Sequence, residues 1–380
     1  MKNSANILIR WYNYVGDIVY KKALEVLKIF AGKGYLAYIV GGYVRDMLLD
    51  KESFDIDICT SATPREIMDI FDIEKASDYK YGCVKIVYKG VKFDVATFRK
   101  DIKYEDNRKP IKIKYIGDLK KDLLRRDFTI NTFCIDKDGN ILDVLNVRDD
   151  LDNRLIRTIG NPRYKIKEDA LRILRAVRFA TILDFEIDKK TKEYIIKYGY
   201  LLKKLSYNRK KEELLKIFSS SNKEKGRKLL IDLNLWKYLD LINLTDIVMC
   251  DDILGIWSQL DDISNYPFSN YEKQQIKIIK KLSKREIDDY DLYCYEPYLC
   301  SIAGQINGSD TSNMMKRYDN LIIKSFKDVD ISPTCISTIL EKEPGKYIKD
   351  IMNDVEKKII FKEIPNIEKN IKKYIIDNYK

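Results

Sequence analysis

The spacing of apolar residues changes near residue 149, and this change limits the chain to folds in which a mixed α/β part precedes a helical part. Before this point, short apolar runs alternate with glycine-containing turns, which is typical of strands. After it, apolar residues recur at helical spacing. The expected strands are 36–40, 54–59, 84–88, 91–97 and 133–135, and the expected helices are 170–180, 193–205, 212–218 and 225–235.

Composition excludes several kinds of site. The chain of 380 residues contains no histidine, which excludes Ser-His-Asp triads, H-E-x-x-H zinc sites and His-Asp phosphohydrolase chemistry. Its seven cysteines are scattered and form no C-x-x-C pair, so neither a disulfide framework nor a zinc site is indicated. A formal net charge of +11 fits a polyanionic partner, although a lysine-rich composition explains the charge equally well. With no apolar run of about 20 residues and no secretory signal, we expect a cytoplasmic protein without membrane spans.

Two aspartates alternate with aliphatic residues in the segment Phe54-Asp55-Ile56-Asp57-Ile58. On a strand, Ile56 and Ile58 would be buried on one face, while both aspartates would project from the other. Neighbouring carboxylates repel unless a cation lies between them, and Mg²⁺ prefers carboxylates together with substrate phosphates. The pair is therefore a candidate metal site for phosphoryl or nucleotidyl transfer, although any amphipathic strand with one face in water shows the same alternation.

Further candidate residues flank the aspartate pair. Gly41 and Gly42 would let the backbone approach a phosphate closely, and Arg45 lies in the helix expected to follow, although a glycine pair is also typical of an ordinary tight turn. Asp94, in the strand-like segment 92–97, would either help to deprotonate the attacking hydroxyl group or have a structural role.

Two arginine-rich segments lie further along the chain. Arg126 belongs to the segment 125–131, which could hold a triphosphate and a ribose or could form a surface ion-pair cluster. Arg172, Arg175 and Arg178 recur every three residues on an expected helix. Such a ribbon fits triphosphate or RNA phosphates, but it is also typical of a solvated helix face. It would lie opposite an apolar stripe of Ala170, Leu174 and Val177.

Together these motifs resemble a known family. Gly-Gly-x-Val-Arg-Asp at 41–46, Asp-x-Asp at 55–57, Arg-Arg-Asp-Phe-Thr-Ile-Asn at 125–131 and the segment 168–180 follow the order found in class II tRNA nucleotidyltransferases and bacterial poly(A) polymerases. The resemblance covers residues 35–218. It implies an α+β protein in which a nucleotidyltransferase-type α/β head is followed by an all-helical neck, body and tail, expected at 1–147, 148–210, 211–270 and 271–380.

The resemblance also implies roles for individual residues. Asp55 and Asp57 match metal-binding acids, and Gly42, Arg45 and Arg126 match nucleotide contacts. Asp169 and Arg172 match a pair that reads the incoming base, since a carboxylate and a guanidinium group can imitate a complementary base edge. With the family context, Arg175 and Arg178 are assigned to nucleotide binding as well.

Within the family, segment 97–110 resembles the flexible loop of CCA-adding enzymes, and segment 343–366 resembles the tail of their Gram-positive type. This implies Mg²⁺-dependent addition of CCA from CTP and ATP to the 3′ end of tRNA, with the helical parts binding the acceptor arm. Poly(A) polymerase activity on RNA 3′ ends is the alternative within the family. The alternative without enzymatic activity is a catalytically silent RNA-binding protein on the same scaffold.

Overall fold

The computed structural model describes residues 2–73, 82–105 and 109–380. The chain divides into two compact units, Met1–Leu239 and Asp240–Lys380. The expected boundary between neck and body at 210/211 falls inside helix α9, and the expected body at 211–270 spans the division between the units. The four-part organisation therefore stays a prediction.

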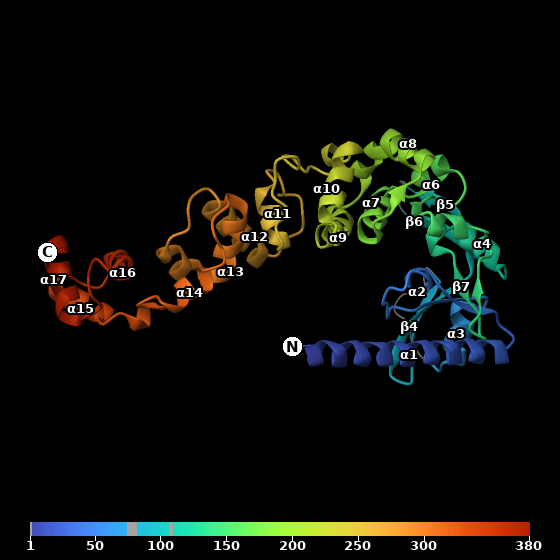
Figure 1. Ribbon diagram of the computed structural model, residues 1–380, viewed down its shortest axis with the longest axis horizontal. Helices are drawn as coiled ribbons and strands as arrows, with labels where there is room; N and C mark the ends of the chain where they lie inside the picture. Colours follow the sequence, from blue (N-terminus) through green and yellow to red (C-terminus); the bar gives the residue numbers. More distant parts are fainter. Residues whose placement is uncertain (1, 74–81, 106–108) are drawn as a thin grey trace. The chain divides into compact units, whose positions relative to one another are not determined.

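The first unit contains the strands and the helices that carry the sequence motifs (Figure 1). Its elements are α1 (Lys2–Gly32), β1 (Ala37–Val40), α2 (Gly42–Leu48), β2 (Asp57–Thr60), α3 (Pro64–Ile70), β3 (Cys83–Tyr88), β4 (Val91–Thr97), β5 (Arg99–Glu105), β6 (Lys109–Tyr115), α4 (Leu119–Leu124), a 3-10 helix at Thr129–Asn131, β7 (Cys134–Ile135), β8 (Ile141–Leu142), α5 (Arg148–Asp152), β9 (Leu155–Ile156), α6 (Pro162–Glu168), α7 (Leu171–Leu183), β10 (Glu186–Ile187), α8 (Lys189–Tyr198), a 3-10 helix at Gly199–Lys204, α9 (Tyr207–Phe218), α10 (Lys223–Asp232) and a 3-10 helix at Trp236–Tyr238.

A six-stranded sheet in the order β3-β4-β2-β1-β7-β8 supports the N-terminal part. Strands β2 and β4 are parallel, and the other neighbours are antiparallel. The register places Asp57 of β2 opposite Asp94 of β4 and opposite Val40 of β1. Helix α1 packs against β1 and β4 and contributes a buried apolar row of Ala23, Val26, Leu27 and Phe30 (Figure 1).

The sequence located five of the strands, one of them with a correction, and did not predict β5, β6, β8, β9 or β10. β1, β3, β4 and β7 lie where expected, and Lys89 and Gly90 turn β3 into β4 with positive φ at both positions, as a tight hairpin requires. Strand β2, however, begins only at Asp57, so the expectation of a strand from residue 54 was wrong for its first three residues. The reason is that β1 ends at Val40, the partner of Asp57, and the chain then turns away at Gly41. Residues 54–56 therefore have no residues of β1 opposite them to pair with.

The predicted loop at 97–110 coincides with an antiparallel pair, β5 and β6, which forms a separate two-stranded sheet. Residues 106–108 of this predicted loop lie outside the described residues. The expected helices correspond to α7, α8 with the 3-10 helix after it, α9 and α10. We expected only helices in this part of the chain. This expectation was wrong in one place, because β9 and β10 form a short parallel pair.

The second unit, as far as it is described, is helical. Its elements are α11 (Ile253–Gln259), α12 (Asn270–Leu282), α13 (Asp289–Asn307), α14 (Met314–Asp319), a 3-10 helix at Phe326–Asp328, α15 (Pro333–Leu340), α16 (Lys346–Ile360) and α17 (Glu368–Tyr379). Buried side chains of α12, α13 and α14 form one apolar cluster, and those of α15, α16 and α17 form another. Helix α13 is kinked at Glu296, whose φ is 62°, directly before Pro297.

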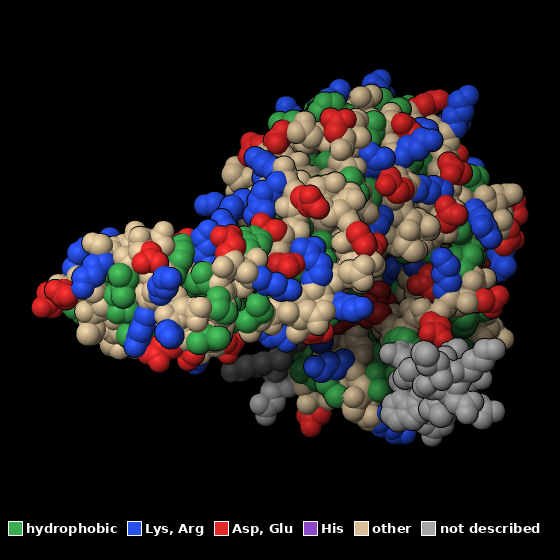
Figure 2. Space-filling view, turned by 60° about the vertical axis from the view of Figure 1, so that its left-hand side comes forward, with side chains coloured by type: hydrophobic (Ala, Val, Ile, Leu, Met, Phe, Trp, Pro, Cys, Tyr) green, Lys and Arg blue, Asp and Glu red, His purple; other side chains and the backbone are tan. Residues whose placement is uncertain are grey.

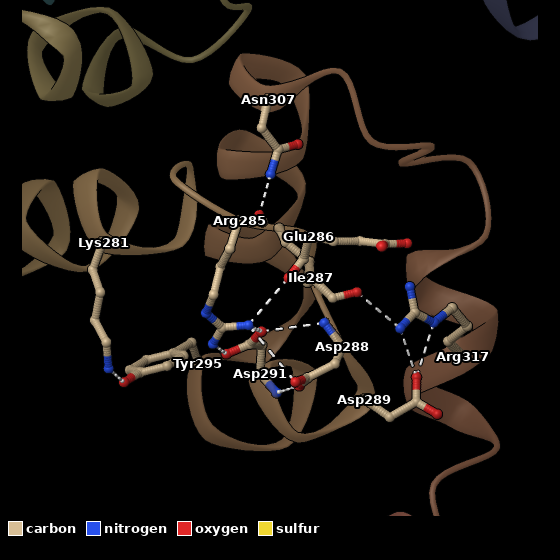
Figure 3. Close-up of polar contacts among 10 residues, drawn as sticks. All are labelled: Lys281, Arg285, Glu286, Ile287, Asp288, Asp289, Asp291, Tyr295, Asn307 and Arg317. Atoms are coloured by element: carbon tan, nitrogen blue, oxygen red, sulfur yellow. Dashed lines mark hydrogen bonds and ion pairs between the residues drawn. The ribbon is translucent and has the colours of Figure 1, made fainter.

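An ion-pair cluster fixes the connection between α12 and α13 (Figure 3). Asp291 is 2% exposed and accepts hydrogen bonds from both terminal nitrogens of Arg285, at 2.7 and 2.5 Å. It also belongs to the capping box at the start of α13, where it exchanges backbone bonds with Asp288. Nearby, Arg317 of α14 donates to Asp289 at 2.9 Å and to the carbonyl of Ile287. These bonds hold the first turn of α13 against the preceding segment and α14.

The surface carries mixed charge. On the face shown in Figure 2, Lys and Arg side chains lie among acidic ones and do not form one continuous basic patch. None of the helices in the described part is both long and apolar enough to cross a membrane.

Arg285→Met tests the cluster at the start of α13, because it keeps an apolar stem but leaves the buried Asp291 carboxylate without its charged partner. We expect the second unit to lose about 2 kcal/mol of unfolding free energy. Trp257 is buried in this unit, so its fluorescence during urea denaturation, in a Trp11→Phe, Trp236→Phe background, would report on this unit.

Lys281→Met is the matched control. Lys281 contacts the hydroxyl group of Tyr295 in an exposed position, and its loss should change stability by less than about 0.5 kcal/mol. Equal urea midpoints for the two variants would contradict a stabilising role for the ion pair.

Candidate active site

The glycine turn at the end of β1 brings the backbone close to the aspartate pair. Gly41 has φ 88° and ψ −137°, a conformation that residues with a side chain rarely adopt. A Cβ atom added there would lie 3.7 Å from an Oδ of Asp57 and 4.0 Å from a terminal nitrogen of Arg126. Glycine therefore allows the chain to turn into α2 directly beside these two side chains.

The two aspartates lie on the same side of their segment, as the alternation predicted. Ile56 and Ile58 are buried, whereas Asp55 and Asp57 are exposed to the site. Loss of surrounding water, followed by repulsion from Asp55, raises the pKa of Asp57 to about 6, although its side chain still reaches solvent. This electrostatic cost would be relieved by a cation between the two carboxylates.

The donor set at this position fits Mg²⁺. No group of three or more Cys, Asp or Glu side chains that could enclose a metal ion occurs among the described residues. Two carboxylates beside open cavity space match the coordination of Mg²⁺, which usually keeps several waters and is completed by substrate phosphates. A cage built entirely of protein oxygens is more typical of Ca²⁺.

Asp94 lies beside the pair but apart from the cavity. It is aligned with Asp57 on the neighbouring parallel strand, so both side chains emerge from the same face of the sheet. Its carboxylate is 4.0 Å from the ammonium group of Lys85, and it adds to the repulsion that raises the pKa of Asp57. Its catalytic role stays a prediction.

A cavity of about 550 Å³ joins the aspartate pair to the arginine-rich segments. It contains nine of the ten site residues predicted from the sequence, and only Asp94 is missing from its lining. Among the described residues, seven arginines and one lysine line it, against four aspartates. The lining consists of Gly41, Gly42, Arg45, Asp55, Asp57, Arg99, Arg125, Arg126, Asp127, Asn131, Asp169, Leu171, Arg172, Arg175, Arg178, Phe179 and Lys216.

Buried partners hold the arginines of the head in place. Arg45 donates to Asp46 at 2.7 and 2.9 Å and to the side-chain oxygen of Asn131 at 2.7 Å. Asp122 is fully buried and binds Arg126 at 3.2 Å as well as Arg125. The segment 125–131 is thus a structured part of the cavity wall, and the alternative of a surface ion-pair cluster does not hold.

Asp127 links the head to α7. One of its oxygens accepts from Arg175 at 2.7 and 2.5 Å, and the other accepts from the amide of Phe128 and from Asn131. Burial alone would raise the pKa of Asp127, but the charge and hydrogen bonds of Arg175 and the bonds from Phe128 and Asn131 lower it to about 2. The carboxylate therefore stays ionised and fixes the direction of Arg175.

The arginine ribbon of α7 is buried rather than solvated. Arg172 and Arg178 are each 7% exposed and Arg175 is partly buried, so the alternative of a solvated helix face does not hold. Arg172 donates to the backbone carbonyls of Lys165 and Arg125 and to Glu168. Asp169, which precedes α7, accepts from the amide of Leu171 at 3.0 Å, and burial raises its pKa.

Sequence reasoning gave no site role to several residues in or behind the cavity, among them Glu213, Lys216 and Phe179. Glu213 on α9 is buried and pairs with Arg178 at 2.9 Å, while Lys216 on the same helix lines the cavity with an exposed side chain. The aromatic ring of Phe179 also lines it. Glu213 and Lys216 stand one helical turn apart, but nothing in the pattern of α9 indicated which side chains meet the cavity.

These features define a class of protein. A glycine turn and an aspartate pair at the start of β2 face a cavity rich in guanidinium groups, which is what metal-dependent transfer from a nucleoside triphosphate requires. The molecule is a nucleotidyltransferase.

Comparison with known proteins specifies the family. Residues 37–157 match the family described as poly A polymerase head domain, residues 184–241 the probable RNA and SrmB-binding site of polymerase A, and residues 263–375 the putative tRNA nucleotidyltransferase domain 2. The chain is 33% identical to the CCA-adding enzyme of Ligilactobacillus salivarius, over 95% of this chain and 96% of that protein. It is 30% identical to the CCA-adding enzyme of Anoxybacillus flavithermus, over 95% and 98% of the two chains. This chain belongs to the family of CCA-adding enzymes and is a tRNA nucleotidyltransferase.

The fold agrees with that of a solved relative. The crystal structure of the Bacillus stearothermophilus CCA-adding enzyme in complex with CTP superimposes with a TM-score of 0.83, covering 94% of this chain and 97% of the other at 24% identity. This agreement confirms the expected α+β class with a nucleotidyltransferase head.

Asp127→Asn should destabilise the first unit in a pH-dependent way. Because the folded-state pKa of about 2 is below the ordinary value of 3.8, the ionised carboxylate stabilises the fold above about pH 4, and this contribution is lost as the pH falls toward 2. We expect the variant to lose about 2 kcal/mol at pH 7, measured by urea denaturation, and the difference from wild type to shrink at pH 3.

Asp138→Asn provides the control, because Asp138 is an exposed carboxylate that pairs with Lys137 on the surface of the same unit. It should change stability by less than about 0.5 kcal/mol. A difference between wild type and Asp127→Asn that stays constant from pH 7 to pH 3 would contradict the proposed charge contribution.

Proposed function

We propose that this enzyme completes the 3′ CCA end of tRNA from CTP and ATP in the cavity that joins the aspartate pair to the arginines, with release of pyrophosphate. The observation that carries the proposal is the convergence of nine predicted site residues on that one cavity. The full-length similarity to relatives named CCA-adding enzyme supports the choice of reaction. The 3′ hydroxyl group of the tRNA would attack the α-phosphate in line.

Asp55 and Asp57 are the proposed metal ligands, because both line the cavity and Asp55 is near enough to raise the pKa of Asp57 by repulsion. A Mg²⁺ ion bound there would stabilise negative charge on the reacting phosphate. The aspartates themselves position the reacting groups next to the Gly41 turn, where the backbone comes close to Asp57. Asp94, on the adjacent strand, is proposed to assist deprotonation of the tRNA hydroxyl group.

The nucleotide would extend from the aspartates into the arginine-lined part of the cavity. Arg45, Arg126, Arg175 and Arg178 are proposed to bind the triphosphate, with Gly42 allowing close approach of the backbone. Their carboxylate and amide partners hold them before the substrate arrives, which reduces the reorganisation needed during the reaction.

The base would be read at the start of α7. Asp169 would accept a hydrogen bond from the exocyclic amine shared by cytosine and adenine, while Arg172 would donate to a ring acceptor. Both side chains line the cavity, and Arg172 is anchored by two backbone carbonyls. This anchoring would give the protein a fixed template for the base edge.

The helical neck, body and tail are proposed to bind the acceptor arm of tRNA by its shape and backbone, in the cytoplasm. Basic side chains are available on the visible surface, where acidic side chains separate them (Figure 2). Such spacing suits several separate phosphate contacts along an RNA helix better than one strong polyanion site.

Asp55→Asn and Asp57→Asn test the proposed metal site. Each should reduce incorporation of labelled CTP and ATP into tRNA transcripts lacking all or part of CCA by about 10³-fold, because several kcal/mol of transition-state stabilisation are lost. The dissociation constant for tRNA should change by less than about twofold, since Lys and Arg side chains, and not carboxylates, supply the electrostatic attraction to RNA phosphates.

Asp50→Asn is the matched control, since Asp50 lies in the connection between α2 and β2 that also carries Asp55, but does not line the cavity. It should retain normal incorporation, and Asp94→Asn would then show whether Asp94 acts in the reaction. Normal turnover in either variant of the pair would refute the metal site. Long oligo(A) products without cytidine would instead indicate poly(A) polymerase activity, and tRNA binding without any incorporation would indicate a silent RNA-binding protein.

A further inference from the structure

Phe179 occupies an unusual place for an aromatic side chain in the wall of a polar cavity. It lies on α7, is 8% exposed and lines the cavity together with the arginines. The ring also contacts the core: it packs in an edge-to-face arrangement with the ring of Phe128, and the two centroids are 5.8 Å apart. Packing against Phe128 thus fixes the orientation of the ring.

Three guanidinium groups lie over this one ring. The central carbon of Arg178 is 4.4 Å from the ring centroid, and those of Arg45 and Arg175 are each 5.2 Å away. All three distances are within the range of about 6 Å in which the electron-rich face of an aromatic ring attracts a cation. Because the ring is largely removed from water, these attractions are less screened than they would be on the surface.

The ring is the group that the three arginines share. Their other partners come from separate segments: Asp46 and Asn131 for Arg45, Asp127 for Arg175, and Glu213 for Arg178. These separate partners offset the three charges one by one, and the ring adds the one contact that all three guanidinium groups have in common. The pKa of Arg178 is lowered by burial and also by the charges of Arg175 and Arg45, against the opposing effect of Glu213, so these groups do repel one another.

We propose that Phe179 is a positioning residue that holds Arg45, Arg175 and Arg178 in the arrangement that receives the nucleotide triphosphate. This role rests on the proposed function of the cavity. A leucine at this position would fill much of the same space, but it has no electron-rich face to attract the cations. The aromatic character of Phe179, rather than its volume, therefore sets the affinity of the cavity for a polyphosphate.

Graded fluorination separates ring electronics from packing. Replacing Phe179 by 4-fluorophenylalanine and by pentafluorophenylalanine in the full chain weakens the negative ring face stepwise with little change in shape. We expect the dissociation constant for inorganic triphosphate, measured calorimetrically, to rise with each step and to reach about tenfold for the pentafluoro residue. Phe179→Leu should give a similar loss, with KM for CTP and ATP increasing more than kcat falls.

Phe133→Leu is the matched packing control, since Phe133 is 1% exposed in the same unit and does not line the cavity. It should lower the melting temperature but leave the affinity for triphosphate within about twofold of wild type. Equal affinities across the fluorinated series, or a loss in Phe133→Leu as large as in Phe179→Leu, would overturn the proposal and reduce Phe179 to a core residue.

A second readout does not depend on the reaction. Protons of guanidinium groups over an aromatic ring resonate upfield, so three arginine side-chain signals should be shifted in the wild-type protein and return toward ordinary positions in Phe179→Leu. If these signals were shifted but wild-type protein neither bound triphosphate nor incorporated nucleotides, the proposed function would fail and the positioning role with it. If wild type were active and the signals were unshifted, only the role of Phe179 would fail.

Discussion

Positive charge concentrated in one partly buried cavity is the constraint on which the first unit depends. In the part of the chain that the structure describes, seven arginines line a space of about 550 Å³, and guanidinium groups gathered in one cavity repel one another strongly where water is scarce. The fold balances them with buried acids. Asp122 pairs with Arg125 and Arg126, which follow it within one helical turn. Asp127 and Glu213 pair with arginines that are 48 and 35 residues away. Neutralising the cavity therefore also ties the sheet-bearing part to α7 and α9.

Carboxylates of the same kind acquire opposite properties from this arrangement. Asp127 is surrounded by Arg175 and amide donors, which hold its pKa near 2, and it serves as an anchor. Asp57 has limited water and a second carboxylate beside it, which raise its pKa to about 6. A fully paired acid has no capacity left for a substrate or a metal, while a pair of uncompensated acids attracts a cation. The environment thus separates the structural acids of the cavity from the acids that can act in chemistry.

The sequence predicted much of the fold because its local signals agree with the tertiary structure. The hairpin at Lys89 and Gly90 and the alternation around Asp57 depend on backbone conformation and side-chain period, which neighbouring residues determine. The start of β2 was misplaced because it depends on where β1 ends, and β1 is a partner from another part of the chain. The burial of Arg172 and Arg178 could not be predicted from the sequence either, because helical periodicity shows which residues share a face but not what covers that face.

The sequence by itself determined the order of the motifs, the change from an α/β part to a helical part, and the residue types available for chemistry without histidine. Only the tertiary structure decided which of these residues meet. It brought Lys216 and Phe179 into the cavity, left Asp94 outside the lining, and joined Arg178 to Glu213. The physical reason is that charge pairing and ring contacts act over a few ångströms in space, and the separation of residues along the chain does not specify those distances.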